Sequence, residues 1–416
     1  MPKLALYFIC KNESHIVKRM LKSALPITDL IVVNDTGSTD GTQEIIRRFG
    51  QKHKIPTFIF ERPFDDFGSS REFSRVKLLE VANQIGWNLS EAWGFCFDCD
   101  EKLAIDTTFM RDSLDMDMYF VHCFRKGRVS NRMFLFRLSA NCRWFGAVHE
   151  RLEKTNKSVL VGNIYGLKLV VEQKGNSWKG DLAKKFLGHA KLMEDYLEKH
   201  GREGHFLHTT GQCLISAASY CKNKRERELL YKKGLKYFIE AEQSRDIHFE
   251  ERYSAQMHIS SILYTLRAPW EQVESSYLKA HEIDPVRAEP FHSLIAHQLK
   301  NQDWDKAYLY SKWLVDHYQG NAPMDTRGIR IIPSLYGIRA LCTHIMICYF
   351  SGRIGEGKAL YKNILEFTRH FPDRFTYEDL AHIYSNRPSL IKIKKFTYQI
   401  RYVYNKIRYV YNKIKK

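Results

Sequence analysis

The chain has 416 residues, of which 44% are hydrophobic and 13% are aromatic. This composition excludes a mainly disordered or fibrous protein, and the length allows a large core without disulfides or metals. Lys and Arg outnumber Asp and Glu by 65 to 47, which gives a formal net charge of +18. That excess permits a nucleic-acid, membrane-surface or anionic-cofactor partner and does not choose between them.

Two features of the sequence bear on where the protein acts. No stretch reaches the roughly 18 uninterrupted apolar residues that a spanning helix needs, and the apolar start at 4–10 meets Lys11 too soon for a signal peptide. The nine cysteines are scattered and fit a reducing compartment better than a disulfide framework. We therefore expect a cytoplasmic protein.

From residue 1 to about 175, short apolar strands alternate with amphipathic helices. Strands are expected at 4–10, 30–34, 57–60 and 93–97, and helices at 15–25, 42–49 and 70–85. This alternation predicts an α/β fold with a mostly parallel sheet covered by helices. In such sheets ligands bind beyond the carboxyl ends of the strands, so site residues are expected in the strand-end loops.

From about residue 180 to 370, helical periodicity replaces the strand pattern. Trp270 and Trp304 lie 34 residues apart in related contexts, and Pro285 closes the helix that contains Ala280. A period of this length resembles a tetratricopeptide pair. We expect an all-α, tetratricopeptide-like region, and a non-repetitive helical bundle is the alternative.

The excess charge is concentrated in the last 31 residues. Residues 386–416 contain ten basic residues and no acidic one, so 18 − 10 leaves +8 on the rest of the chain. The tandem heptads 400–406 and 407–413 repeat apolar residues at three- and four-residue steps. A helix here would suit an anionic membrane surface, since its basic residues fall largely away from the apolar face. Packing on its own domain or on a second copy of the chain is an alternative, and nucleic acid is a third.

The first candidate motif, NDTGSTDGT at 34–42, directly follows the strand at 30–34. Asp35 at the strand end is placed to accept hydrogen bonds from a ribose or a base. A well-made turn between a strand and a helix is the alternative. The glycine spacing fits neither a P-loop nor a dinucleotide fingerprint.

The second motif is DCDE at 98–101, directly after the apolar residues 95–97. Alternate side chains of an extended segment point the same way, so we expect Asp98 and Asp100 to face together. Paired carboxylates repel unless a cation lies between them, and Mg²⁺ or Mn²⁺ in such a place usually bridges to substrate phosphates. A solvated acidic turn is the alternative.

Two further motifs offer a base, a metal ligand and an anion contact. His149 and Glu150, in WFGAVHE at 144–150, supply one candidate metal ligand and one candidate general base, with a structural pair as the alternative. Arg71 ends FDDFGSSR at 64–71 and opens a helix, where a guanidinium favours phosphate.

Together these motifs resemble the GT-A glycosyltransferases of family 2. The resemblance rests on CKNES at 10–14, the Asp35 motif, DCDE at 98–101 and GAVHE at 146–150, in the family's order. A subgroup of the family pairs this catalytic domain with a tetratricopeptide-like domain. Within it, the chain is similar to bacteriocin S-glycosyltransferases and to lipopolysaccharide-core glucosyltransferases.

The resemblance implies a nucleotide pocket lined by Asn12, Glu13 and Asp35. Arg71 matches an arginine that the family often places before Asn, although Glu72 follows it here. These residues would bind the nucleotide-sugar donor.

The resemblance also implies a metal site. Asp98 would face the ribose or the metal, and Asp100 would bind the Mn²⁺ or Mg²⁺ that bridges the diphosphate. Related proteins carry a further His-x-Gly, whereas residues 171–175 read VEQKG, so His149 is the candidate for the third ligand. With Asp100 occupied by metal, Glu150 is expected to be the catalytic base.

The implied protein has a GT-A domain at 1–178, a tetratricopeptide-like domain at 179–370 and a basic amphipathic tail at 371–416. It would move a sugar with inversion from a nucleotide-diphosphate donor, a UDP-sugar, to a peptide, protein or glycan acceptor. It would be cytoplasmic and able to dock on the inner face of a membrane through its tail, and a homodimer is compatible with it. The alternatives are an inactive repeat scaffold, or a nucleic-acid-binding protein or DNA-base glycosyltransferase that uses the tail. Nucleic acid is disfavoured because the sequence lacks a recognised nucleic-acid motif.

Overall fold

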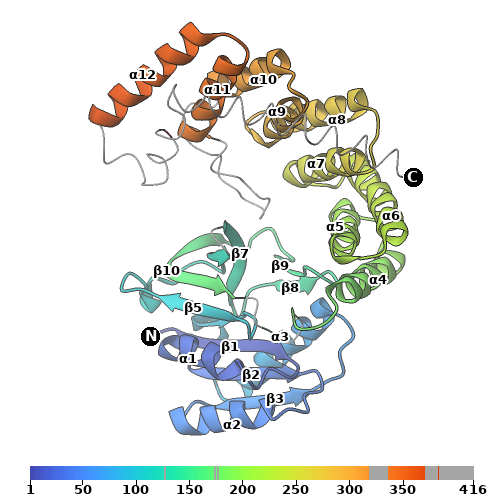
Figure 1. Ribbon diagram of the computed structural model, residues 1–416. Coiled ribbons are helices and arrows are strands. Elements are labelled where there is room, and N and C mark those ends of the chain that lie inside the picture. Colours follow the sequence, from blue (N-terminus) through green and yellow to red (C-terminus); the bar gives the residue numbers. More distant parts are fainter. Residues whose placement is uncertain (126–127, 173–174, 176–177, 318–335, 371–382, 384–416) are drawn as a thin grey trace. The chain divides into compact units, whose positions relative to one another are not determined.

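The computed structural model describes residues 1–125, 128–172, 175, 178–317, 336–370 and 383. The chain divides into two compact units, one built on Met1–Ala255 and one that begins at Gln256. Figure 1 shows arrows for strands in the first unit, followed along the chain by helices. The domain boundaries expected at 178/179 and 370/371 stay predictions.

The first unit is organised around an eight-stranded sheet with the order β3-β2-β1-β4-β7-β6-β10-β5. The strands are β1 (Lys3–Cys10), β2 (Leu30–Asp35), β3 (Thr57–Glu61), β4 (Ala92–Phe95), β5 (Glu101–Ile105), β6 (Met118–Arg125), β7 (Arg128–Arg137) and β10 (Val161–Val171). Pairings β1–β2, β1–β4, β2–β3 and β6–β10 are parallel. Pairings β4–β7, β6–β7 and β5–β10 are antiparallel. The expected α/β fold with a mostly parallel sheet is therefore confirmed.

Both faces of the sheet are covered. Helices α1 (Val17–Ala24) and α2 (Thr42–His53) pack on one face, and α3 (Phe67–Gln84) packs on the other with a ribbon of β8 (Cys142–Phe145) and β9 (Arg151–Lys154). Strand β1 supplies both cores because successive side chains of a strand point to opposite faces. Leu6 and Phe8 join the α1–α2 core, whereas Ala5 and Tyr7 join the α3 core. Burial on both sides explains why these strands are continuous apolar runs in the sequence.

The parallel strands bring several loops to one edge of the sheet. Cys10 at the end of β1 pairs with Asp35 at the end of β2. Strand β4 runs parallel to β1 on its other side and ends at Phe95, three residues before Asp98. The loops that carry Asn12, Asp35 and Asp98 therefore leave the sheet at the same edge, where ligands bind in open α/β sheets.

Some expected elements differ from the observed ones. The helix expected at 70–85 begins earlier, at Phe67, because the Asp66 side chain accepts a 2.7 Å hydrogen bond from the Ser69 amide and caps the helix. The strand expected at 93–97 ends at Phe95. The short 3₁₀ turns Leu25–Ile27, Leu89–Glu91 and Arg111–Ser113, and the strands β5 to β10, were not predicted from the sequence.

Helices follow the last strand of the first unit. They are α4 (Leu182–His200), α5 (Gly204–Tyr220) and α6 (Lys224–Gln243), and α7 (Phe249–Thr265) crosses the limit between the units. Asp181 caps α4 by accepting a 3.1 Å hydrogen bond from the Lys184 amide. Helices α5 and α6 approach closely at Gly211, where an added Cβ would lie 2.9 Å from the Phe238 ring.

The described part of the second unit is helical. It contains α8 (Trp270–Ile283), α9 (Glu289–Asn301), α10 (Trp304–His317), α11 (Ile338–Phe350) and α12 (Ile354–His370). Trp270 and Trp304, which suggested the repeat, are the first residues of α8 and α10, with α9 between them. The expected helical region is confirmed.

Two further expectations concern membranes and cysteines. Within the described residues, every helix is too short or too polar to cross a membrane. The tail heptads at 400–406 and 407–413 lie outside the described residues. The nine cysteines all lie within them, and all are buried and outside any disulfide.

Candidate active site

Hydrogen bonds join the loops that follow β1 and β2. The Asn12 amide donates to Ser38 Oγ at 2.9 Å, and Asn12 Oδ1 accepts from the Thr39 amide at 2.8 Å. The Glu13 amide donates to Thr42 Oγ1 at 2.8 Å. Asn12 has a φ of 57°, a left-handed backbone conformation that asparagine tolerates better than most residues. The two predicted pocket residues Asn12 and Glu13 therefore belong to one hydrogen-bonded loop cluster.

Asp35 holds the second of these loops together. Its side chain is fully buried, and Oδ1 accepts from the amides of Gly37 at 2.8 Å and Ser38 at 2.6 Å. Oδ2 accepts a 3.6 Å hydrogen bond from Cys10 Sγ. In this arrangement Asp35 shapes the loop, and a direct contact with a ribose or base stays a prediction that requires the loop to open.

Arg71 brings together residues that are far apart in the sequence. Its side chain is buried in α3, and its NH2 group donates to Asp98 Oδ1 at 2.5 Å while Nε donates to Glu150 Oε1. NH1 lies 3.2 Å from Cys96 Sγ, and the guanidinium lies 5.4 Å from the centre of the Trp144 ring. Arg71, Asp98 and Glu150, three predicted site residues, thus form one cluster. Glu150 is largely covered, with 11% of its side chain exposed.

Glu72, the departure from the family pattern, lies outside this cluster. It accepts hydrogen bonds from Arg75 at 2.7 and 2.9 Å and from the Trp144 amide at 3.0 Å. Glu72 therefore joins α3 to β8, so its role in this structure is to hold the ribbon against the helix.

The expectation that Asp98 and Asp100 lie on an extended segment is wrong, and the expectation that they face together stays a prediction. The segment is a turn, in which the Glu101 amide donates to the Asp98 carbonyl at 3.0 Å and the Asp98 amide donates to Glu101 Oε2 at 2.8 Å. Glu101, 3% exposed, is held by Arg132 through two hydrogen bonds of 2.9 and 2.6 Å. This paired carboxylate closes the turn that contains the two aspartates.

The pKa values of Asp98 and Asp100 shift in opposite directions. Burial disfavours the Asp98 carboxylate, but the charges of Arg71 and Arg132 and the hydrogen bond from Arg71 together outweigh it, so the pKa of Asp98 is lowered. Burial raises the pKa of Asp100 to about 6, and the charges of Asp98 and Glu101 add to the effect. Of these two aspartates, Asp100 is therefore the one whose ionised form a nearby cation would stabilise more.

Glu13 and Asp100 meet at Gly175. A Cβ added to Gly175 would lie 3.3 Å from Glu13 Oε1 and 3.4 Å from Asp100 Cβ. Mg²⁺ is usually bound by one or two carboxylates plus substrate phosphates, so this pair fits an ion held largely by a diphosphate. The predicted set Asp98, Asp100 and His149 does not fit as a closed site, since these residues do not bring three ligand atoms within 4.8 Å of one another.

Helix α4 adds one cationic side chain, Lys185, and one neutral imidazole, His189, neither of which was predicted from the sequence. Lys185 acts electrostatically on Asp100 and on His149, and its Nζ lies 3.9 Å from the centre of the Trp178 ring. His189, one turn further, packs at 5.5 Å on the Phe67 ring, and its Nδ1 is buried without a hydrogen-bond partner among the described residues. Burial lowers the pKa of His189 to about 4, helped by Lys185 and His149. The four-residue spacing of Lys185 and His189 indicates that both lie on one face of a helix. The sequence alone places this helix in the predicted repeat region, not beside the site.

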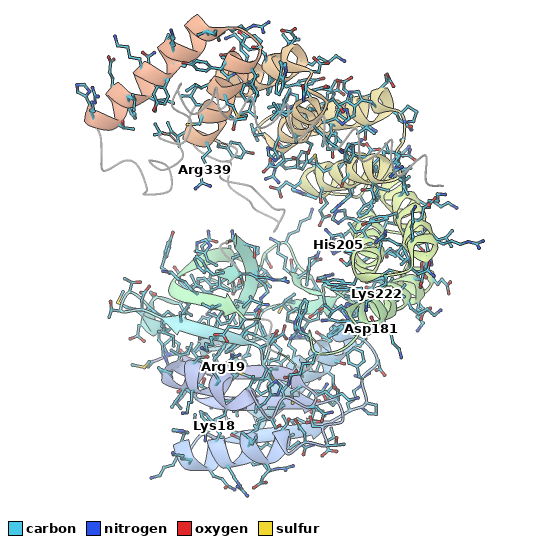
Figure 2. The ribbon with its side chains drawn as sticks, viewed as in Figure 1. Lys18, Arg19, Asp181, His205, Lys222 and Arg339 are labelled. Atoms are coloured by element: carbon cyan, nitrogen blue, oxygen red, sulfur yellow. The ribbon has the colours of Figure 1, made fainter. Side chains whose placement is uncertain are left out.

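His149 and Glu150 lie in a loop that touches the start of α3. The Phe67 amide donates to the Ala147 carbonyl at 3.0 Å, and a Cβ on Gly68 would lie 2.2 Å from the Gly146 carbonyl oxygen. The His149 side chain is exposed, and desolvation by the surrounding protein lowers its pKa against the opposing effect of Glu150. Figure 2 labels Asp181 and His205, which mark the starts of α4 and α5.

Comparisons with known proteins give weak structural likenesses alone. No family model matches the chain, and no curated protein matches it. The solved structure of S. aureus TarS is 12% identical over 66% of this chain and 55% of its own, with a TM-score of 0.35. Its 1–349 fragment is 14% identical over 65% of this chain and 91% of its own, with a TM-score of 0.33. MamA 41-end from Desulfovibrio magneticus RS-1 is 12% identical over 46% of this chain and 97% of its own, with a TM-score of 0.29. At these values none of the three carries an argument about activity.

The observed geometry defines a class of site: paired carboxylates and cationic side chains at the carboxyl edge of a mostly parallel α/β sheet. Such a site can bind a phosphorylated ligand and hold a carboxylate beside it for proton transfer.

Proposed function

We propose that the protein is a glycosyltransferase that moves a sugar from a nucleotide-diphosphate donor, a UDP-sugar, to an acceptor with inversion. The observation that carries the proposal is the cluster in which Arg71 binds Asp98 and Glu150 at the carboxyl edge of the sheet. It supports the resemblance to family 2 because the three motifs, far apart in the sequence, contribute to one place.

The donor would be held by the loops after β1, β2 and β4. Asn12, Glu13 and Asp35 shape the pocket for the nucleotide, and Lys185 of α4 adds positive charge for the diphosphate. Asp100, with Glu13 beside Gly175, would hold Mn²⁺ or Mg²⁺. The ion, when bound, neutralises charge on the departing diphosphate. Asp98 and His149 would complete the surroundings of the donor without being required as ligands.

Glu150 would remove the proton of the acceptor. The acceptor oxygen or sulfur attacks the anomeric carbon, the bond from that carbon to the diphosphate breaks, and the acceptor proton passes to the Glu150 carboxylate. Arg71 Nε donates a hydrogen bond to that carboxylate and orients it. A single displacement inverts the configuration at the anomeric carbon.

The proposal extends to the acceptor and to the location of the protein. A peptide, a protein or a glycan would suit the helical region, and a lipid-linked glycan at an anionic membrane would suit the basic tail. Cytoplasmic location and homodimer formation belong to the same proposal.

The test is a panel of nucleotide sugars with Mn²⁺ or Mg²⁺, scored by release of free nucleotide diphosphate. We expect Glu150→Gln to lose roughly 100-fold or more in turnover while it still binds the donor, because only proton removal is lost. In Asp100→Asn, addition of Mn²⁺ or Mg²⁺ should no longer stimulate release of nucleotide diphosphate. The control Asp112→Asn, at an exposed position in the 3₁₀ turn Arg111–Ser113, should match the wild type. Near-normal turnover in Glu150→Gln would remove its assignment as base. Failure to bind any nucleotide sugar would favour the inactive scaffold.

A further inference from the structure

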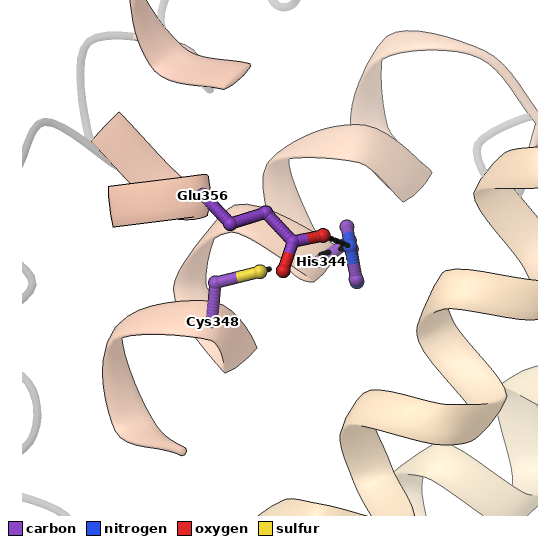
Figure 3. A group of neighbouring side chains, drawn as sticks. All are labelled: His344, Cys348 and Glu356. Atoms are coloured by element: carbon purple, nitrogen blue, oxygen red, sulfur yellow. Dashed lines mark hydrogen bonds and ion pairs between the residues drawn. The ribbon is translucent and has the colours of Figure 1, made fainter. Parts of the chain in front are cut away.

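A second cluster of ligand-type side chains lies in the second unit, among helices α10, α11 and α12. Among the described residues, His344 and Cys348 of α11 and Glu356 at the start of α12 bring one ligand atom each within 4.8 Å of one another. His344 and Cys348 are 1% and 0% exposed. Figure 3 shows the three side chains converging from the two helices. The four-residue spacing of His344 and Cys348 places both on one face of α11.

The separations within this cluster match those of ligands around a tetrahedral ion. His344 Nε2 lies 3.6 Å from Cys348 Sγ and 3.5 Å from Glu356 Oε1. Zinc binds nitrogen and carboxylate oxygen at about 2.0–2.2 Å and thiolate sulfur at about 2.3 Å, so tetrahedral geometry sets neighbouring ligand atoms roughly 3.5 Å apart. The three atoms therefore need little rearrangement to share one ion.

The Ser311 hydroxyl of α10 contacts Nδ1 of His344 and leaves Nε2 to face the other two side chains. Ser311 Oγ lies 3.1 Å from the Tyr308 carbonyl oxygen and 2.8 Å from His344 Nδ1. The tautomer with the proton on Nδ1 donates to Ser311 and presents the Nε2 lone pair to Cys348 and Glu356. Burial lowers the pKa of His344, which favours this neutral form even though Glu356 acts the other way.

His344 Nε2 and Glu356 Oε1 lie 3.5 Å apart and interact electrostatically. A Zn²⁺ ion bound to both atoms would replace that interaction with two metal–ligand bonds. The other carboxylate oxygen of Glu356 accepts a 2.9 Å hydrogen bond from the Tyr308 hydroxyl. Tyr308 and Ser311 of α10 thus orient two of the three ligands in the manner of an outer shell around a metal.

We propose that His344 Nε2, Cys348 Sγ and Glu356 Oε1 bind one Zn²⁺ ion, with water as the fourth ligand. On binding, the S–H bond of Cys348 breaks, its proton passes to solvent and a Zn–S bond forms, with no change of oxidation state. Thiolate, carboxylate and Zn²⁺ sum to zero charge, so the loaded site introduces no net charge into the core. The mixed sulfur, nitrogen and oxygen set favours Zn²⁺ over Mg²⁺ or Mn²⁺, which prefer oxygen ligands. The ion would link α11 to α12, a role independent of the transferase site.

The test is metal titration of the full-length chain, with Co²⁺ as a spectroscopic substitute for Zn²⁺. We expect one Zn²⁺ and one released proton per chain, and a thiolate-to-cobalt charge-transfer band that Zn²⁺ abolishes. Cys348→Ser should lose the band, whereas Cys342→Ser, at a buried cysteine of the same helix, should keep it. The same titration in the Asp100→Asn variant removes any contribution of the active site.

Two more variants guard against a folding defect in Cys348→Ser. Glu356→Gln, at a partly exposed position, should weaken Zn²⁺ binding more than the outer-shell change Ser311→Ala, which should cost roughly 10–100-fold. Zn²⁺ should raise the unfolding temperature of the wild type, and a chelator should reverse the rise. A wild type without the thiolate band, or a band that survives in Cys348→Ser, would overturn the proposal.

Discussion

Single residues decide the shape of the candidate active site more than the motifs do. The sequence indicated Arg71, Asp98 and Glu150 separately, and the structure joins them through one guanidinium. The strand-end positions were predictable because parallel neighbours end at one edge. The turn at Asp98 was not predictable, because it depends on Glu101, which is held by Arg132 from a strand distant in the sequence. Lys185 and His189 were missed because only tertiary packing brings α4 to the site.

Glu251 offers a prediction at this scale. It accepts a hydrogen bond from His205 at 2.8 Å and pairs with Arg151, so it joins α7 to α5 and β9. Burial acts to raise the pKa of Glu251, but His205 and Arg151 outweigh it and lower the pKa to about 2. Because the folded pKa is depressed, the stability from this group is present above about pH 4.3 and is lost as the pH falls toward 2.

We expect Glu251→Gln to lower the free energy of unfolding by about 2–3 kcal/mol at pH 7. The difference from the wild type should be the same at pH 5 and should narrow below about pH 4. Urea unfolding at pH 7, 5 and 3.5 measures it, with Glu198→Gln on the exposed side of α4 as control. A difference that does not change with pH would show that the shift is not the source of the stability.

At the scale of elements, strands buried on both sides were the easiest to predict. Strands β1 and β2 are uninterrupted apolar runs, and both appear within a residue or two of their expected positions. Strands β5 and β10 pair with partners distant in the sequence, whereas β6 pairs with its neighbour β7 and β8 with its neighbour β9. The mixed polarity of these strands gives no clear period in the sequence. The start of α3 was predicted three residues too late, because Asp66 was not recognised as the residue that caps the helix.

The contact between α3 and the loop of Glu150 gives a second prediction. A Cβ on Gly68 would lie 2.2 Å from the backbone oxygen of Gly146, so Gly68→Ala must push the two elements apart. We expect a loss of about 1–3 kcal/mol in stability from the clash, and a roughly 10- to 100-fold loss of turnover as Glu150 moves.

Gly188→Ala in α4 is the matched control, because an added Cβ there meets nothing within 4 Å. It should raise stability by about 0.5–1 kcal/mol through helix propensity. Thermal unfolding and nucleotide-diphosphate release measure both variants. Equal stability of Gly68→Ala and the wild type would contradict the packing argument.

At the scale of the whole molecule, composition predicted the order of parts along the chain. The change from strands to helices lies between Val171 and Leu182, close to the shift in composition near residue 180. The limit of the compact units at Ala255 and Gln256 has no sequence signal, because it depends on which helices pack together. The amphipathic tail is predicted only from its ten basic residues and its tandem heptads, because the heptads lie outside the described residues.

Removal of residues 386–416 should lower the formal charge from +18 to +8 and weaken binding to anionic vesicles, with little effect on neutral ones. Co-sedimentation at low and high salt measures this. A tail of the same composition in scrambled order separates charge from amphipathicity, since it keeps the ten basic residues and loses the apolar face. Equal vesicle binding with and without the tail would contradict membrane docking. If removal of the tail instead abolishes binding to DNA, nucleic acid would be favoured as the partner of the tail.

The nine buried cysteines are natural labelling sites that can report local opening of the structure. A thiol reagent can modify a covered sulfur only when the surrounding structure opens, so each labelling rate reports the opening of one neighbourhood. Cys10, Cys96 and Cys99 report on the carboxyl edge of the sheet, and Cys342 and Cys348 report on α11. Mass spectrometry after timed labelling would therefore rank the elements by their opening rates in the unmodified protein.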